Sequence, residues 1–454
     1  MKKYDVIIIG AGPAGIVTGI IAKKQFPDKS ILMIQENEKG LVPCGIPYVF
    51  HDLDSVNENA MGPKGFIDLG GEVMTDPVID VDVKQKKLGT QSGDTVMFDK
   101  LVFATGSKEV IADFIPGFDL KNVFYIKKNF EYIENLINTL KDKKNIVVVG
   151  GGFIGAEVAE QLAKNTDKKV SLIESEEFCF SKAFSYDLSK IATEQLKKAN
   201  VNVYTSTLVE RVIGKDGCVT AVQLNNNKEI KTDVVIFSVG YKPNTELAKN
   251  AGLQLNKMGA IHVDNYGRSV EKDIYAVGDC SQTIGFLTGR SDNIMLASTA
   301  TAEARVLGYN LYGVTIKNSF MGTIGIFSSE INGLSMASVG LNEKNAITAN
   351  IQFITAQFSA PDRHPGAIKG SSLLTAKLYV SPSDGSILGA EIWGGKSSGE
   401  IINTLGLAIQ NELTVYELIS LQIGTHPLLT SAPTMPVIIK AAEIAISKIQ
   451  SVNK

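Results

Sequence analysis

The feature that most constrains the fold is a glycine-rich loop that occurs twice, each time between an apolar strand and a helix. The first loop, Gly10-Ala11-Gly12-Pro13-Ala14-Gly15, follows the apolar run Tyr4–Ile9. The second, Gly150-Gly151-Gly152-Phe153-Ile154-Gly155, follows Asn145–Val149. A strand, a Gly-x-Gly-x-x-Gly turn and a helix form a unit that holds a dinucleotide pyrophosphate at the helix N-terminus. Two such units in one chain predict two dinucleotides and electron transfer between them.

The remaining apolar runs complete these units and set the domain boundaries. We expect helices that end near Gln25 and Asn165 or begin after Ser397 and Pro433, and strands at Ile31–Ile34, Leu101–Gly106, Val170–Ile173, Val234–Gly240, Asp273–Asp279, Gly322–Phe327, Leu374–Val380 and Ile387–Ile392. The pattern predicts an α/β chain with two Rossmann-like dinucleotide-binding domains and an α+β C-terminal domain. The predicted domains are residues 1–115 with 241–320, residues 116–240, and residues 321–454.

Composition excludes several classes of protein. The chain has 454 residues, of which 44% are apolar and 20% charged, so it is globular and long enough for about three domains. Its net charge of -3 gives no basic surface for nucleic acid. Glycines and Pro13 interrupt the apolar run Val6–Ala22, so we expect a strand, turn and helix there rather than a signal peptide or membrane span.

The four cysteines, at positions 44, 179, 218 and 280, form no Cys-x-x-Cys pair. This spacing is typical of neither a disulfide scaffold nor a zinc site, so we expect no metal. It favours a protein of the reducing cytoplasm, in which a single cysteine is either packed in the core or reactive.

These landmarks together resemble the pyridine nucleotide–disulfide oxidoreductases, which are FAD flavoproteins that take hydride from NAD(P)H. The resemblance runs from the first glycine loop through Ala104-Thr105-Gly106, the second loop and Val277-Gly278-Asp279 to a C-terminal interface domain. It therefore covers essentially the whole chain. In the family the C-terminal domain forms a twofold dimer, so the resemblance implies a homodimer.

The segment Pro43-Cys44-Gly45-Ile46-Pro47-Tyr48 resembles the single-cysteine branch of this family. That branch holds coenzyme A disulfide reductases, NADH oxidases, NADH peroxidases and persulfide or polysulfide reductases. Val49 and Lys39 stand five residues after and before Cys44, so a dithiol mechanism lacks its second sulfur.

The resemblance assigns FAD to the first loop and to residues further along the same domain. Glu36 would hold the adenosine ribose, Asp279 the ribityl chain, and Leu296 and Ala297 would lie under the isoalloxazine. The expected FAD residues are Gly10, Gly12, Pro13, Ala14, Gly15, Glu36, Val78, Thr105, Gly106, Asp279, Leu296 and Ala297.

The second loop would bind NADH in preference to NADPH. Glu174 ends the second strand of its unit, where a carboxylate accepts the ribose hydroxyls and repels a 2′-phosphate. Phe153 stands where the family places an aromatic lid over the flavin; the alternative is a residue that packs the helix start on the sheet. The expected NAD residues are Gly150, Gly152, Phe153, Ile154, Gly155, Glu174 and Gly240.

Three residues are candidates for the chemistry: Cys44, His426 and Glu157. We expect Cys44 at a helix start, where its thiolate can attack a disulfide or persulfide or cycle through sulfenic acid. His426 of the partner subunit would supply a proton; alternatively it caps its own loop. Glu157 would face the flavin crevice or be a solvated helix carboxylate, and His51 is a weaker candidate.

Departures from the family leave the electron acceptor open. NADH peroxidases carry a His where this chain has Pro13, which argues against a dedicated peroxide reductase. The disulfide reductases carry a Glu a few residues after a His-Pro pair, and this chain has Ser431 at that place. The identity of the proton donor is therefore open as well. The leading hypothesis is reduction of a small disulfide, persulfide or polysulfide, such as coenzyme A disulfide. The alternatives are an NADH oxidase that reduces O₂ and, less favoured, a reductase of a small electron-carrier protein. We expect no nucleic acid or membrane partner.

Overall fold

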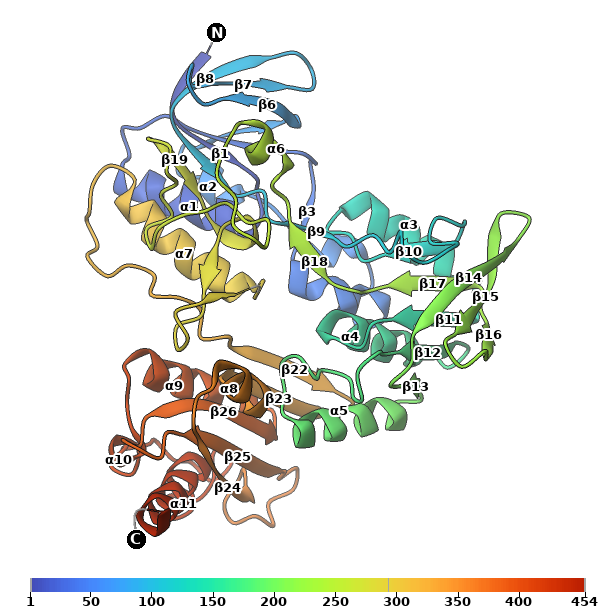
Figure 1. Cartoon of the computed structure of the whole chain (residues 1–454), viewed down its shortest axis with the longest axis vertical. Helices are drawn as coiled ribbons and strands as arrows, with labels where there is room; N and C mark the ends of the chain where they lie inside the picture. The colour runs from blue at the N-terminus through green and yellow to red at the C-terminus, as the bar shows by residue number, and fades with distance from the viewer. Residues whose placement is uncertain (1, 293, 453–454) are drawn as a thin grey trace. The chain divides into compact units, whose positions relative to one another are not determined.

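The computed structural model of the chain describes residues 2–292 and 294–452, which form two compact units (Figure 1). The first unit comprises Met1–Gly150, Val209–Ile284 and Arg290–Gly322. The second comprises Gly151–Leu208, Gly285–Gly289 and Thr323–Lys454. This division by compactness does not follow the boundaries of nucleotide-binding domains, so the domain limits predicted from the sequence stay a prediction.

A largely parallel sheet forms the core of the first unit. β1 lies between β2 and β8, β5 extends the sheet beside β2, and β19 pairs in parallel with β8. The bounds of these strands are β1 (Lys2–Ile9), β2 (Ile31–Gln35), β5 (Glu72–Thr75), β8 (Thr95–Phe103) and β19 (Ile274–Ala276). β6 (Val78–Asp82) and β7 (Lys87–Thr90) continue it as an antiparallel hairpin.

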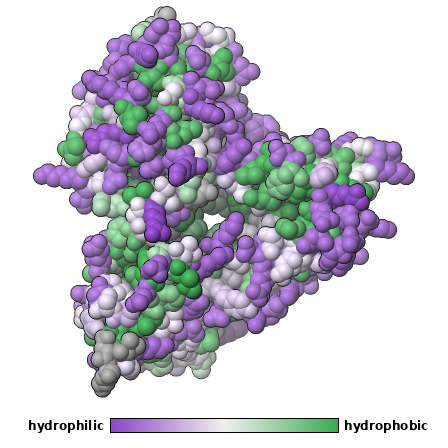
Figure 2. All heavy atoms as spheres, viewed as in Figure 1, coloured by the Kyte–Doolittle hydropathy of each residue, from purple (hydrophilic) through white to green (hydrophobic). Residues whose placement is uncertain are grey.

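Both faces of this sheet are covered, which explains the continuous apolar run of β1. Val6 and Ile8 pack under the helices α1 (Pro13–Gln25) and α7 (Ala297–Asn310), which lie side by side in Figure 1. Ile7 and Ile9 face the opposite way, toward the cluster that includes residues of α6 (Glu246–Asn250). In a parallel strand that is buried on both faces, the side chains of both faces are apolar, so the sequence does not alternate between apolar and polar residues. Figure 2 shows that hydrophilic side chains predominate on the visible surface around the β6–β7 hairpin.

The rest of the first unit consists of smaller elements. β10 and β11 pair in parallel on either side of β17, and β14, β15 and β16 form an antiparallel sheet that the sequence did not predict. These elements are α2 (Lys64–Ile67), β10 (Val123–Tyr125), α3 (Phe130–Leu140), β11 (Asn145–Val149), β14 (Val209–Lys215), β15 (Cys218–Leu224), β16 (Glu229–Lys231) and β17 (Val234–Phe237). Four two-residue strands and one short ribbon complete the unit: β3 (Gly40–Leu41), β4 (Ala60–Met61), β20 (Thr283–Ile284), β21 (Ser291–Asp292), and β9 (Ser107–Glu109) with β18 (Tyr241–Pro243).

An antiparallel sheet in the order β22-β23-β26-β25-β24 organises the second unit. One face packs on α9 and α11 through a single apolar cluster. The elements of this unit are α4 (Phe153–Ala163), β12 (Lys169–Ile173), α5 (Tyr186–Lys198), β13 (Asn202–Tyr204), β22 (Phe327–Ile331), β23 (Leu334–Gly340), α8 (Glu343–Ala349), β24 (Ile354–Pro361), β25 (Leu373–Val380), β26 (Ile387–Gly394), α9 (Ser398–Gln410), α10 (Val415–Leu418) and α11 (Val437–Val452).

The opposite face of this sheet carries a buried polar network. Glu391 of β26 is fully buried and accepts hydrogen bonds from the Ser185 backbone N–H at 2.5 Å, the Ser185 hydroxyl at 2.6 Å and the Tyr379 hydroxyl at 3.1 Å. Lys377 is also buried and lies 2.8 Å from Glu343 and 3.5 Å from Asp187. The network ties the start of α5 to the sheet, because a buried carboxylate needs these donors.

Four predicted strands end earlier than expected or are misplaced, and positive φ angles of glycines account for two of them. The strand expected at Gly322–Phe327 is wrong: β22 begins at Phe327, because Gly322 and Gly325 adopt positive φ angles of 118° and 57°. The strand expected at Leu101–Gly106 ends at Phe103, before Gly106 with its φ of 65°. The strands expected at Val234–Gly240 and Asp273–Asp279 are also shorter, and end at Phe237 and Ala276.

Candidate active site

The first glycine loop is held tightly against the end of β8. Gly10 has a φ of 114°, and a Cβ there would lie 2.2 Å from the Ala104 carbonyl oxygen. A Cβ at Gly15 would lie 1.9 Å from the Gly10 carbonyl oxygen. Gly12 has no described heavy atom within 4 Å of its Cβ position, so this side of the turn is open. Two glycines permit the turn and the third leaves space for a ligand.

The helices that follow the two loops start without a capping side chain. Gly12 and Gly152 are the N-cap residues of α1 and α4; neither helix has a side-chain cap or an acidic residue in its first turn among the described residues. In contrast, Asn129 and Ser185 cap α3 and α5. Uncapped helix N-termini present unpaired N–H groups and a partial positive charge. Both loops therefore fit the pyrophosphate of a dinucleotide.

Glu174 lies against the second glycine loop. A Cβ at Gly150 would lie 2.3 Å from the Ser238 carbonyl oxygen, which repeats the packing of the first loop. One carboxylate oxygen of Glu174 accepts the Gly151 N–H at 2.6 Å, and the other accepts the Glu176 N–H at 2.8 Å. The predicted ribose carboxylate is thus fixed beside the loop, and its role toward NADH stays a prediction.

Phe153, the predicted flavin lid, packs in a cluster of four aromatic rings within the second unit. Its ring stacks on Phe327 at a centroid distance of 5.3 Å and meets Phe180 and Phe184 edge to face. This packing corresponds to the alternative that we considered for Phe153. Phe153 is half-buried, and its role as a flavin lid stays a prediction. Ile154 and Gly155 continue α4 behind it.

Glu157 of α4 is held by β22. Its carboxylate accepts the Ser329 hydroxyl at 2.8 Å, and burial raises its pKa to about 7. Because Glu157 is half-buried and bonded to Ser329, it differs from a fully solvated helix carboxylate, and its role toward the flavin stays a prediction. A carboxyl that titrates near neutral pH can act as a proton donor or acceptor, which keeps Glu157 a candidate.

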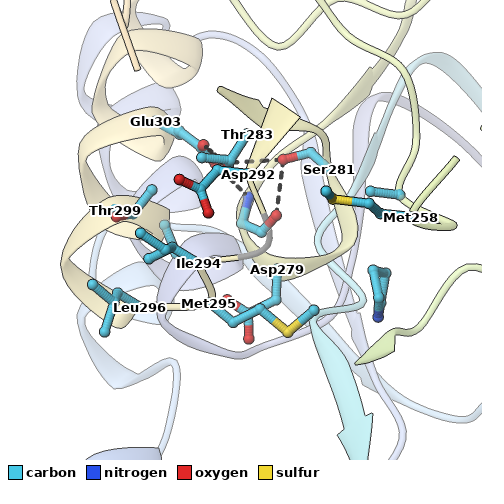
Figure 3. Close-up of a pocket in the computed structure, with 14 residues that line it drawn as sticks. Met258, Asp279, Ser281, Thr283, Asp292, Ile294, Met295, Leu296, Thr299 and Glu303 are labelled. Carbon is cyan, nitrogen blue, oxygen red and sulfur yellow. Dashed lines mark hydrogen bonds between the residues drawn. The ribbon is translucent and has the colours of Figure 1, made fainter. Parts of the chain in front are cut away.

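The predicted FAD residues of the first unit converge on the turn Gly278–Cys280. A Cβ at Gly278 would lie 2.9 Å from the Ala14 Cβ, so the turn touches the start of α1. Asp279 accepts the Ser107 hydroxyl at 2.7 Å and lies 3.1 Å from the Lys128 ammonium. Asp279 also lines a pocket with Leu296, the N-cap residue of α7 (Figure 3). Ala297 is the first residue of that helix.

The other predicted FAD residues lie at strand ends of the same unit. Thr105 donates its hydroxyl to the Asn244 carbonyl at 2.6 Å, and Gly106 has a φ of 65°. Glu36 is exposed directly after β2, and Val78 is the first residue of β6. Gly240, predicted for NAD, has a φ of 110° and open space at its Cβ position. Pro13 is the first residue of α1.

One residue of this pocket was missed by the sequence analysis. Glu303 of α7 accepts hydrogen bonds from the Gly278 N–H at 2.9 Å, the Thr283 hydroxyl at 2.9 Å and the Ser281 hydroxyl at 3.4 Å (Figure 3). Burial raises its pKa to about 7. One signal in the sequence could have identified Glu303. It is a charged residue among the small side chains of α7, three positions after the buried Ala300.

Cys44 is exposed and is the second residue of the 3₁₀ helix Pro43–Phe50. The sequence predicted this position at a helix start. The antiparallel pairing of β3 with β4 closes the loop that contains it. The buried Asn59 amide donates to the Val42 carbonyl at 3.1 Å, and a Cβ at Gly45 would lie 2.0 Å from the Asn59 oxygen. The sulfur is therefore presented by a loop that is fixed on both sides.

The other three cysteines lie in other segments of the chain. Cys280 is fully buried, and its sulfur lies 3.4 Å from the Phe103 carbonyl oxygen. Burial raises the pKa of the Cys179 thiol to about 12, so at neutral pH it is not a nucleophile. Cys218 is the first residue of β15.

His426 is exposed in the C-terminal loop. Its Nδ1 accepts the Leu428 N–H at 3.2 Å, so the proton of the neutral ring lies on Nε2. This contact supports the loop-capping reading and also leaves Nε2–H as a hydrogen-bond donor. His51 is exposed and its Nδ1 lies 3.0 Å from Asp52, which agrees with a surface residue.

Comparison with known proteins identifies the family. The model of the family described as pyridine nucleotide-disulphide oxidoreductase matches residues 4–304. The chain belongs to this family. The family's dimerisation-domain model matches residues 329–436.

The NADH oxidase of Methanocaldococcus jannaschii is 30% identical over 93% of this chain and 94% of that protein. The Pyrococcus abyssi NAD(P)H sulfur oxidoreductase (CoA-dependent) is 30% identical over 87% of this chain and 88% of that protein.

A solved structure supports the same membership for this pyridine nucleotide-disulphide oxidoreductase. The NAD-dependent persulfide reductase from A. fulgidus is 29% identical, covers 98% of this chain and 84% of that chain, and has a TM-score of 0.91. The two-Rossmann fold with a C-terminal α+β domain is thereby confirmed. Within residues 2–292 and 294–452 no group of three or more His, Cys, Asp or Glu is arranged to hold a metal ion. The described helices include none with the length and apolar character that a bilayer crossing needs.

Proposed function

We propose that this oxidoreductase binds FAD at the first loop and NADH at the second, and that it reduces a small disulfide, persulfide or polysulfide through Cys44. The observation that carries the proposal is the pair of uncapped glycine-loop helices in a chain that also exposes a clamped cysteine. Bound FAD would supply the electron pair that NADH delivers and that restores the Cys44 thiolate. The names of the Pyrococcus and A. fulgidus relatives support this substrate class.

The chain's own residues would perform the sulfur chemistry. The Cys44 thiolate attacks one sulfur of the substrate, the S–S bond breaks, and a mixed disulfide forms with release of a thiolate. The released thiolate takes a proton from His426 of the partner subunit or from water. The match of residues 329–436 to a dimerisation domain supports a homodimer, which the role of the partner's His426 requires.

An NADH oxidase is the second candidate, favoured by the name of the Methanocaldococcus jannaschii relative. In that case Cys44 would cycle through sulfenic acid while O₂ is reduced. A reductase of a small electron-carrier protein is less favoured, because Cys44 would then have no role. The cysteine pattern supports a cytoplasmic location, where thiols stay reduced.

The purified protein is expected to be yellow and to release FAD, not FMN, on denaturation. An anaerobic titration with NADH should bleach the flavin. Coenzyme A disulfide, a persulfide, polysulfide and O₂ are then admitted separately, and the acceptor that reoxidises the flavin fastest identifies the substrate. A preparation without flavin, or flavin that NADH does not bleach, would contradict the proposed function.

The coenzyme preference is expected to depend on Glu174. The wild-type kcat/KM for NADH should exceed that for NADPH by at least roughly tenfold, because the carboxylate accepts the ribose hydroxyls and repels a 2′-phosphate. Glu174→Ala should remove most of this difference, whereas Glu177→Ala, an exposed neighbour, should leave it unchanged. Equal kcat/KM values for both coenzymes in the wild type would show that Glu174 does not face the ribose.

A further inference from the structure

Glu303, an acid in the pocket of Figure 3, accepts three hydrogen bonds, and the proposed sulfur chemistry does not use it. Its two carboxylate oxygens accept one backbone N–H and two hydroxyls, and all three donors belong to the segment Gly278–Thr283. Figure 3 shows its side chain directed from α7 toward this segment. The bonds therefore join α7 to the turn that follows β19.

This turn carries Asp279, which points away from Glu303 toward another set of partners. Asp279 accepts the Ser107 hydroxyl at 2.7 Å and lies 3.1 Å from Lys128. Gly278, whose N–H Glu303 accepts, has a φ of 77° and packs so closely that a Cβ would lie 2.9 Å from the Ala14 Cβ. A small shift of the turn would therefore move Asp279 and also disturb the first glycine loop.

We propose that Glu303 is a positioning residue for the FAD site, which fixes the Gly278–Ser281 turn and thereby sets how tightly the chain retains FAD. The inference rests on the proposed function, because it assumes that the pocket of Asp279 and Leu296 receives FAD. Glu303 acts through Asp279 and the turn, so it is not a catalytic residue.

The proposal includes a dependence on pH. Burial raises the pKa of Glu303 to about 7, and the negative charge of Asp279 also opposes its ionisation. The other titratable group that lines the pocket is Asp292. The ionised carboxylate has acceptors for all three donors, whereas a protonated carboxyl carries a hydrogen on one oxygen. The turn is therefore fixed best above the pKa, and FAD should be held less tightly as the pH falls through about 7.

The test compares FAD retention by the holoenzyme and its variants. Each protein is diluted at pH values between about 5.5 and 8.5, and released FAD is measured by its fluorescence. Wild-type affinity should fall as the pH falls through about 7. Glu303→Gln should weaken FAD binding roughly 10- to 100-fold at high pH, the usual effect of a hydrogen bond to a charged group, and should remove the pH dependence. Arg305→Gln, an exposed change on the same helix, is the control.

A second variant separates positioning from a general loss of folding. Thr283→Val removes one of the donors that stabilise the carboxylate, so the pH midpoint of FAD retention should move upward while the protein still folds. Apo-protein unfolding is followed for every variant. Unchanged affinity and an unchanged pH midpoint in Glu303→Gln and Thr283→Val would overturn the inference. A wild-type protein that binds no FAD would instead overturn the proposed function.

Discussion

Cys44→Ser is expected to lower the turnover of disulfides and persulfides by at least roughly 10³-fold while FAD stays bound and NADH still reduces it. The serine hydroxyl is a poor nucleophile at neutral pH, and removal of a nucleophile has effects of this size or larger. Cys44 is exposed on a clamped loop, so the substitution should leave the fold intact. Stopped-flow absorbance measures the two half-reactions separately.

The control is Cys218→Ser, which changes a cysteine of the β14–β16 sheet and should retain wild-type turnover. Sulfur reduction by Cys44→Ser at the wild-type rate would mean that this thiol is structural. If Cys44→Ser kept only O₂ reduction, with peroxide as product, the flavin would pass electrons to oxygen directly. Reduction of the sulfur acceptors would then be the activity that requires Cys44.

His426→Ala is expected to slow the oxidative half-reaction by roughly 10²–10⁴-fold, the usual range for a lost proton transfer. With Nδ1 occupied by the Leu428 N–H, the neutral ring can donate only from Nε2. Flavin reduction by NADH should barely change, because no proton from His426 is needed there. Stopped-flow kinetics and a sedimentation experiment on the same sample test the proposal.

His51→Ala provides a matched control, since His51 is exposed and paired with Asp52. If His426 only caps its loop, His426→Ala should lower the thermal stability and leave both half-reactions at their wild-type rates. A monomer in solution would also remove His426 from the mechanism, because its role requires the partner subunit.

Local sequence patterns predicted the Rossmann units well. β11 has the predicted bounds Asn145–Val149, and α1 ends at the predicted Gln25. β11 is an apolar run followed by a glycine loop, and α1 is a helix preceded by one, and such a loop requires the backbone conformation of this turn. The same approach failed at Gly322–Phe327, where apolar residues suggested a strand although the intervening glycines adopt positive φ. The β14–β16 sheet was missed because its strands alternate apolar and charged residues only weakly.

The candidate site was predictable where a motif places residues near each other in sequence. Cys44 and Glu174 lie where their motifs put them, whereas Glu303 depends on donors that the fold brings from the Gly278–Thr283 segment. The resemblance also gave no account of Asn59, whose contacts with Val42 and Gly45 come from the pairing of β3 with β4. Such long-range contacts leave no periodicity in the sequence.

The buried Glu391 network has a consequence for how the protein is made. Ser185 leaves the ribosome long before Glu391, yet the hydrogen bonds that fix the start of α5 need both residues. A nascent chain that ends before β26 therefore contains α5 but lacks Glu391, the carboxylate that accepts the hydrogen bonds of Ser185. Translation proceeds at roughly 5–20 residues per second, so this segment waits about 10 to 40 seconds for its partner. During that interval the Ser185 side chain can still cap α5 through the Leu188 N–H, a contact between residues that are close in sequence.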